Sequence, residues 1–431
     1  DQEIFFMLWN HDDFQFQAKS TTEIPAALRG HHVANIAPAD FNSDGNVDLL
    51  VVCFRQSDKR FPSFILYGKG DGTFDPSRGT KVATFQDQPS VMDVNSDLIP
   101  DLVVPVSSDV SFWVNSLQTG SLDPAPGCEL LDDADHDSDV WECGSFNMVG
   151  GVGSLSGEWC GVLSGDIDGD CRTDIVVLER SLKQEDSLLS VWRSTGATTS
   201  QIAGGKAAYV RLGEPVKVPP GDGCGALVDF DGNGMLDIVF PRNDSIHILY
   251  NKLESPQGGV GEELCNAGAV GSDVSVFDTS PRNYVQFGNS TTTIASSRLL
   301  GADAVFQPPT VRPGDWDRDS YPDLVVAGTT PSSRRHSPPY HLTSYHLTPY
   351  HYHPTFLHNV KCSVEVCGQA ANDMGRRTLE LVTDYDDNWN RGHCYAAAFI
   401  DLDERGSLDL ITLHATPLRR RTLSADGDGG D

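Results

Sequence analysis

The chain has 431 residues and a formal net charge of −30 at pH 7. This acidic balance argues against nucleic acid as a partner, because proteins hold the phosphate backbone mainly through Lys and Arg. An apolar fraction of 39% is enough to build a hydrophobic core, so global disorder is excluded.

Six similar acidic motifs, here called loops one to six, recur along the chain and begin at residues 40, 93, 166, 229, 315 and 401. Each starts with Asp, has an oxygen-bearing residue at position three and usually at position five, and has another Asp at position nine. Their starts lie 53 to 86 residues apart. Repeats of this length with strands in each unit are typical of β-propellers. The sequence therefore predicts an all-β propeller with six motif-bearing blades.

The apolar runs that follow the loops, such as "DLLVV" and "DIVVL", predict strands. The first segment, "IFFMLWNHDDFQF" (4–16), has the pattern of the second half of a blade, and the last motif with "DLITLHA" (409–415) has that of a first half. We expect these halves to pair and close the ring without exposed edges. The expected organisation is a propeller over 1–415, with insertions at about 116–165, 252–300 and 329–358, and a disordered tail over 416–431.

The spacing of the oxygen-bearing residues predicts calcium sites. Ca²⁺ takes six to eight oxygen ligands, and side chains at alternating positions converge when the backbone curls around the ion. Loop six is expected to be empty or weak, because Arg405 occupies position five. The predicted ligands are Asp40, Asn42, Asp44, Asp48, Asp93, Asn95, Asp97, Asp101, Asp166, Asp168, Asp170, Asp174, Asp229, Asp231, Asn233, Asp237, Asp315, Asp317, Asp319 and Asp323.

Position six of each loop should adopt a positive φ, which glycine tolerates best. Gly45 and Gly234 therefore make loops one and four the strongest candidates, whereas Leu98 is expected to resist this conformation and weaken loop two. An EF-hand is excluded, because β-rich sequence follows each loop and no Glu stands at position twelve. Metal-free turns stabilised by Asp and Asn side chains remain an alternative.

Ten cysteines and two glycosylation sequons point to an oxidising compartment. There is no zinc-type CxxC arrangement, no signal peptide and no apolar run of about 18 residues. We expect the extracellular face of a membrane, as an ectodomain, or secretion. The disulfide candidates are Cys128 with Cys143 and Cys362 with Cys367, and the glycosylation candidates are Asn243 and Asn289.

The repeat unit resembles the FG-GAP repeat of integrin-α-like propellers. The segments "FQDQPSVMDVNSDLIPDLVV", "GDWDRDSYPDLVV", "FLHNVKCSVEVC" and "AAAFIDLDERGSLDLI" resemble, in this order, the T-cell immunomodulatory protein family. The resemblance implies an FG-GAP propeller of seven blades in a type I membrane protein. It also implies an upstream FG-GAP motif, a C-terminal β-domain and a transmembrane helix, none of which this chain contains, so any membrane association would run through segments absent here. The role it implies is cell-surface interaction and adhesion-type signalling.

The chain has no GxSxG elbow, HExxH or Walker-type loop, so we expect no enzymatic activity. The function predicted is an extracellular propeller that binds a protein ligand. The alternative is a carbohydrate-binding, lectin-like or lyase-like propeller, which would place Trp or Tyr at the same point of every blade. The seven Trp residues fall at different points relative to the motifs, which disfavours it. An intracellular scaffold would require free thiols.

Overall fold

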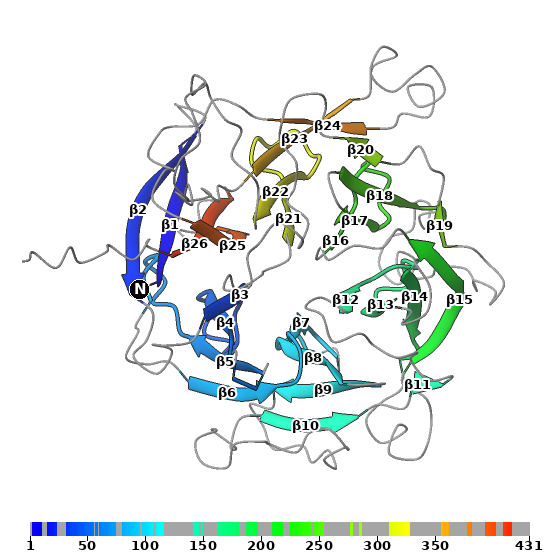
Figure 1. The fold of residues 1–431 in the computed structure, drawn as a ribbon, viewed down its shortest axis with the longest axis horizontal. Coiled ribbons are helices and arrows are strands. Elements are labelled where there is room, and N and C mark those ends of the chain that lie inside the picture. Colours follow the sequence, from blue (N-terminus) through cyan, green and yellow to red (C-terminus); the bar gives the residue numbers. More distant parts are fainter. Residues whose placement is uncertain are drawn as a thin grey trace, which may run out of the picture.

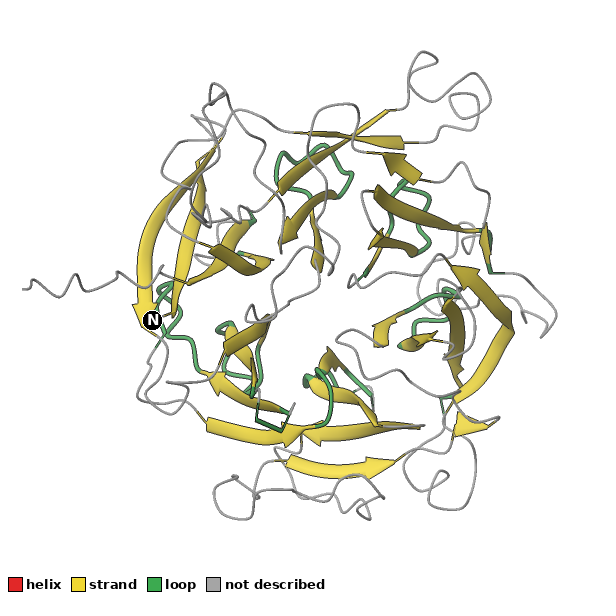
Figure 2. Cartoon of the chain, viewed as in Figure 1, coloured by secondary structure: helices red, strands yellow, loops and turns green. Residues whose placement is uncertain are grey.

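In this computed structural model the strands and most of the loops between paired strands are described. The described residues are 2–10, 15–23, 32–55, 57–58, 60–74, 80–94, 97–106, 109–115, 141–145, 148–149, 162–180, 187–196, 209–218, 225–242, 245–253, 276–278, 284–286, 310–327, 355–361, 377–381, 393–401 and 408–415. This part of the chain is all β-structure (Figure 2). Within it, no helix is long and apolar enough to cross a membrane.

The strands of the described residues form six sheets around a common axis (Figure 1). In chain order they are β1 (Gln2–Asn10), β2 (Gln15–Glu23), β3 (His32–Ala39), β4 (Asp48–Phe54), β5 (Phe61–Leu66), β6 (Thr80–Phe85), β7 (Ser90–Met92), β8 (Asp101–Val106), β9 (Asp109–Asn115), β10 (Trp141–Ser145), β11 (Met148–Val149), β12 (Val162–Gly165), β13 (Asp174–Arg180), β14 (Ser187–Ser194), β15 (Tyr209–Val218), β16 (Ala226–Val228), β17 (Asp237–Arg242), β18 (Ser245–Asn251), β19 (Phe277–Asp278), β20 (Tyr284–Gln286), β21 (Thr310–Gly314), β22 (Asp323–Ala327), β23 (Thr355–Lys361), β24 (Arg377–Leu381), β25 (His393–Ile400) and β26 (Asp409–Ala415).

Each sheet is one blade whose strands run outward from the axis, and paired strands are antiparallel except for β11, which pairs with β15 in parallel. The innermost strands β25, β3, β7, β12, β16 and β21 contact one another in this sequence around the ring, and β21 contacts β25 again. The fold is therefore the β-propeller that the repeats predict. Strands also occur in all three ranges expected as insertions: β10, β11 and β12 lie in 116–165, β19 and β20 lie in 252–300, and β23 begins within 329–358. The expected tail, 416–431, lies outside the described residues.

One blade is built from both ends of the chain, as predicted. Its order is β2-β1-β26-β25, and β1 pairs with β26 in antiparallel register from Gln2 opposite Ala415 to Met7 opposite Leu410. The N-terminal hairpin thus supplies the two outer strands and the last motif supplies the two inner strands (Figure 1). This pairing removes the free edges that an open ring of sheets would expose.

The hydrophobic core lies between the blades. Six clusters of buried apolar side chains are present, one between each pair of neighbouring sheets, including the pair that closes the ring. In β8, Leu102 packs into the cluster toward the preceding blade and Val103 into the cluster toward the next. Because both faces of such a strand are buried, its sequence is a continuous apolar run and not an alternation.

Candidate functional site: acidic loops at one end of the ring

The acidic loops connect the innermost strand of each blade to its second strand. Loops one to five lie between β3 and β4, β7 and β8, β12 and β13, β16 and β17, and β21 and β22, and loop six lies between β25 and β26. Since every blade runs outward from the axis in the same strand order, this topology places all six loops at the same end of the ring.

The Asp at position one organises the turn in loops one to five. In loop four, the backbone N–H groups of Asn233 and Gly234 donate to Asp229 Oδ1 and Oδ2 at 2.9 and 2.8 Å. The side chain at position five then accepts from the N–H of position seven, as Asn233 does from Met235 at 2.8 Å. The same three hydrogen bonds recur in the other four loops. These are the side-chain-stabilised turns that Asp and Asn favour.

Backbone conformation at position six does not depend on glycine. Leu98 has φ +68°, close to Gly45 at +83° and Gly234 at +87°, so the expectation that Leu98 would resist this turn is wrong. The hydrogen bonds to Asp93 fix the turn, and the Leu98 side chain is 89% exposed and meets no steric obstacle. The strain of a left-handed residue, about 1–2 kcal/mol, is therefore tolerated. Cys171 and Ser320 adopt the same conformation.

The Asp at position nine is fully buried in each of these five loops. In loop four, Asp237 Oδ2 accepts from the N–H of Phe230 at 3.0 Å and Oδ1 from that of Asn251 at 2.7 Å. Burial raises the pKa of Asp237 to about 7, although both N–H groups act in the opposite direction. Burial likewise raises the pKa values of the corresponding carboxyls, to about 6 for Asp48, about 7 for Asp101 and Asp174, and about 8 for Asp323. A nearby cation favours the charged form of such groups.

Three loops bring their carboxylates together. Ligand atoms of positions one, three and nine lie within 4.8 Å of one another in loop three and in loop four; those of positions one, three and five do so in loop five. All of these ligands are oxygens, which is the donor set of a hard divalent cation such as Ca²⁺. The predicted ligands therefore fit calcium in loops three and four.

The remaining loops are less complete. In loop one, Asn42 Nδ2 donates to Asp44 Oδ2 at 3.0 Å, so the side chains of positions three and five hydrogen-bond to each other. Asn95 in loop two and Arg405 in loop six lie outside the described residues. Asp409 at position nine of loop six is buried like its counterparts.

In the blades of loops one to five, a residue on the third strand or directly after it, here called the facing residue, lies next to this site. The strand register, continued by one residue beyond its last pair, places the facing residue opposite the position-nine Asp. The facing residues of loops one to five are Tyr67, Val114, Arg193, Tyr250 and His358. In loop three, Arg193 Nη1 lies 3.5 Å from Oδ2 of Asp168, which is 2% exposed. In loop five, His358 Nε2 lies 2.8 Å from Asp317 Oδ2. The facing residue thus differs in charge and donor type from loop to loop.

Sequence reasoning missed three asparagines that join neighbouring blades. Asn251 Nδ2 donates to the carbonyl of Ile167 in loop three at 2.8 Å and to that of Leu236 in its own loop at 3.2 Å. Asn115 and Asn359 make the equivalent bonds to Phe41 and Phe230 of the preceding loops. A signal was present, because "FWVN" and "ILYN" end the third strands of their blades and "FLHN" lies two residues before the end of its third strand.

Several predicted residues lie outside what the structure describes. Cys128, Cys362, Cys367, Asn243 and Asn289 are among the residues not described, and only the backbone of Cys143 is described, in β10. Cys171, which was not among the candidates, is disulfide-bonded. The thiol of Cys53 is free and buried, and burial raises its pKa to about 12.

No family model matches the chain. It is 24% identical to the T-cell immunomodulatory protein homolog of Plasmodium yoelii yoelii over 70% of this chain and 45% of that protein. It is 23% identical to the T-cell immunomodulatory protein of Rattus norvegicus (88% of this chain, 52% of the relative) and 21% to that of Homo sapiens (91% and 54%). The chain thus spans about half the length of the curated relatives it matches.

Among solved structures, the chain aligns with that of a lectin from Agrocybe aegerita, with a TM-score of 0.42. That structure was described for the recognition of non-reducing terminal N-acetylglucosamine. The alignment has 12% identity and covers 95% of this chain and 84% of the other. The sequence comparisons confirm the resemblance stated from the motifs: over most of its length, this chain is similar to proteins named T-cell immunomodulatory protein.

Proposed function

We propose that this chain is an extracellular, non-enzymatic β-propeller that holds calcium in acidic loops at one end of the ring and binds a protein ligand. The observation that carries the calcium part is the convergence in loops three and four, where three carboxylates offer ligand atoms within 4.8 Å of one another. Three anionic groups this close repel one another, and two of the three are buried in loop three and one in loop four. A divalent cation would offset both effects.

The role of the ion in this proposal is to hold the loop end of the ring rigid. The position-one and position-nine carboxylates already bind backbone N–H groups, so calcium would stiffen a turn that is formed and not create it. Each inter-blade asparagine carries that rigidity to the preceding blade through its bond to the carbonyl at position two. A rigid rim can present neighbouring loops to a partner in a fixed arrangement, which lowers the entropic cost of binding.

The proposed location and ligand class rest on similarity to relatives. The names of those relatives refer to immunomodulation of T cells, which supports a cell-surface or secreted setting and a partner on T cells. Fold alone does not identify such a partner.

The calcium proposal is tested with Asp231→Asn in loop four and, as a control, Asp71→Asn, an exposed carboxylate in a hairpin outside the loops. Calcium titration calorimetry on the secreted protein should show one site fewer, or one site at least about tenfold weaker, for Asp231→Asn only. Thermal midpoints in EGTA should be similar for both variants and the parent. A parent whose midpoint is the same in excess calcium and in EGTA would contradict the proposal, because a ligand of the folded state raises its stability.

The ligand proposal is tested by flow cytometry of the calcium-loaded protein on T cells. Cells treated with trypsin should lose binding, and cells treated with glycosidases should keep it. Loss of binding after glycosidase treatment would instead favour the carbohydrate-binding alternative.

A further inference from the structure

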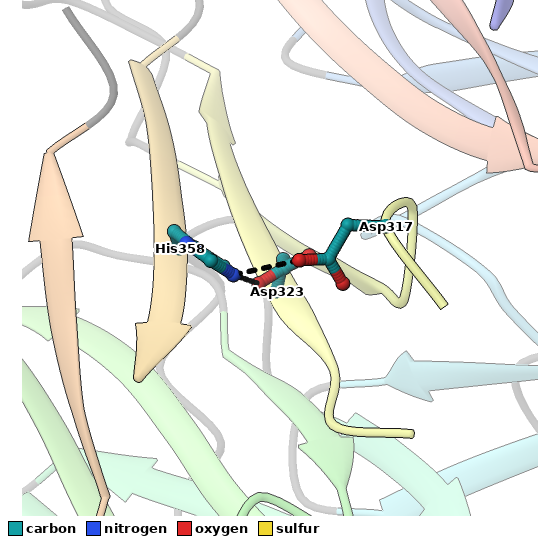
Figure 3. A group of neighbouring side chains, drawn as sticks. All are labelled: Asp317, Asp323 and His358. Carbon is teal, nitrogen blue, oxygen red and sulfur yellow. Dashed lines mark ion pairs between the residues drawn. The ribbon is translucent and has the colours of Figure 1, made fainter. Parts of the chain in front are cut away.

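We propose that loop five and His358 form a site for a divalent transition metal such as Zn²⁺, distinct in ligand chemistry from the calcium sites proposed for the other loops. Its ligands are Asp317 at position three, Asp323 at position nine and His358 on β23, the facing residue of this blade (Figure 3). The three side chains come from the loop, from the start of β22 and from the neighbouring strand, and they point toward one another (Figure 3).

The distances suit a small ion. His358 Nε2 lies 2.8 Å from Asp317 Oδ2 and 3.9 Å from Asp323 Oδ1, and ligand atoms of the three residues all lie within 4.8 Å of one another. Ligands at about 2.0–2.1 Å from a tetrahedral Zn²⁺ are about 3.3–3.4 Å apart, which falls between the two measured separations. Small side-chain rotations therefore suffice to bring the three ligands around one ion.

An unpartnered buried oxygen provides independent support. Asp323 is fully buried, and its Oδ2 has no hydrogen-bond partner. In loops one to four, the equivalent oxygen of Asp48, Asp101, Asp174 or Asp237 accepts the N–H of position two. A buried carboxylate oxygen without a partner is unfavourable. His358 Nε2, which lies nearer to Oδ1 of Asp323, is likewise a buried atom without a hydrogen-bond partner. A metal ion bound between the three side chains would give Nε2 a partner, and a carboxylate of Asp323 that binds it through both oxygens would give Oδ2 one.

The surrounding charges argue against calcium here. Arg377 Nη2 lies 3.3 Å from Asp319 Oδ2, and the Arg377 guanidinium stacks on Tyr321 at 3.4 Å. Asp319 is therefore engaged by a fixed cation and is a poor fourth ligand. What remains is two carboxylates and one imidazole nitrogen, a donor set that suits Zn²⁺ and related ions, whereas Ca²⁺ selects oxygen. Among the five facing residues that the structure describes, His358 is the one with an imidazole nitrogen.

The test measures zinc binding to the untagged, secreted protein by calorimetry in saturating calcium, so that the oxygen-only sites are filled. His358→Gln removes the imidazole, and Asp317→Asn, at a partly exposed position, is a second variant. His247→Gln is the matched control, because His247 lies on β18 of the neighbouring blade and stacks on Phe240. Zinc bound adventitiously by other histidines, including the tract 338–354, should be the same in all four proteins.

One zinc site should be present in the parent and in His247→Gln, and should weaken at least about tenfold in His358→Gln and in Asp317→Asn. Substituted Co²⁺ should give the absorption of a nitrogen-containing site in the parent and lose it in His358→Gln. If His358→Gln binds zinc as the parent does, or if it lowers the thermal midpoint equally with and without zinc, His358 is only an ion-pair partner of Asp317 and the proposal is wrong. Because calcium is titrated separately, failure of this site leaves the calcium proposal standing, and the reverse also holds.

Discussion

Loops three and four are neighbours with the same backbone and different surroundings. Both hold position-one Asp residues through the same N–H bonds, both have left-handed residues at positions four and six, and both bring three carboxylates together. They differ at the facing residue. Arg193 on β14 reaches the buried Asp168 of loop three. Tyr250 on β18 packs against Phe230 of loop four, with ring centroids 6.3 Å apart. The motif thus specifies the shape of the loop, and a residue from another strand sets its charge.

In loop three, the Arg193 guanidinium therefore neutralises part of the negative charge of the carboxylates. In loop four, the facing residue is Tyr250, which is uncharged and cannot do so. Calcium should therefore matter more to loop four. The three predictions below test this comparison, in order of decreasing expected effect.

The largest effect is expected where one side chain contacts both loops. Asn251→Ala removes donors to the carbonyls of Ile167 and Leu236, and the side chain it truncates is 5% exposed. The free energy of unfolding should fall by about 2–4 kcal/mol, because each buried carbonyl left without a donor costs about 1–3 kcal/mol. Urea unfolding should show this loss in calcium and in EGTA alike. A loss below about 0.5 kcal/mol would show that the blades do not depend on this contact.

A smaller effect is expected from making loop three resemble loop four. Arg193→Met removes the cation near Asp168 but keeps the aliphatic packing. In EGTA the free energy of unfolding should fall by about 1–3 kcal/mol, less than for a fully buried pair because the Arg193 side chain is 32% exposed. Calcium should recover most of this loss, because a divalent ion can replace the lost charge. An equal loss in calcium and in EGTA would mean that loop three holds no ion.

The smallest effect concerns the strained turn residue. Leu98→Gly in loop two should raise the free energy of unfolding by about 0.5–1 kcal/mol, since relief of the left-handed strain is partly offset by the greater freedom of glycine in the unfolded chain. Leu98→Ala is the control, because it removes the exposed side chain without relieving the backbone. Equal effects of the two variants, measured by urea unfolding, would attribute the gain to the side chain and not to φ.

Much of the architecture was predictable because each loop and the strand after it are contiguous in sequence. The Asp pair at positions one and nine and the apolar run after it predicted the strands and the turn, and the incomplete terminal segments predicted that β1 would pair with β26. Leu98 was misjudged because a general steric preference was applied where two hydrogen bonds to Asp93 decide the conformation.

The facing residues could not be predicted from the sequence. Arg193 and His358 lie 27 and 43 residues after the starts of their loops, since the connections between the second and third strands differ in length. Only the strand register brings each of them opposite its position-nine Asp. The inter-blade asparagines could have been noticed in the sequence, because each lies at or near the end of a third strand. Their hydrogen-bond acceptors could not, because these belong to the preceding repeat.

The joint between β1 and β26 also sets an order of events during synthesis. The hairpin of β1 and β2 precedes β26 in the chain, and the strand that covers its apolar inner edge begins only at Asp409. Until then Phe5, Phe6 and Met7, which are buried in the finished ring, have no inner neighbour strand to pack with. During synthesis these apolar side chains therefore stay uncovered until β26 has been made. A chaperone that shields β1 in that interval would benefit this fold more than a fold whose neighbouring strands are close in sequence.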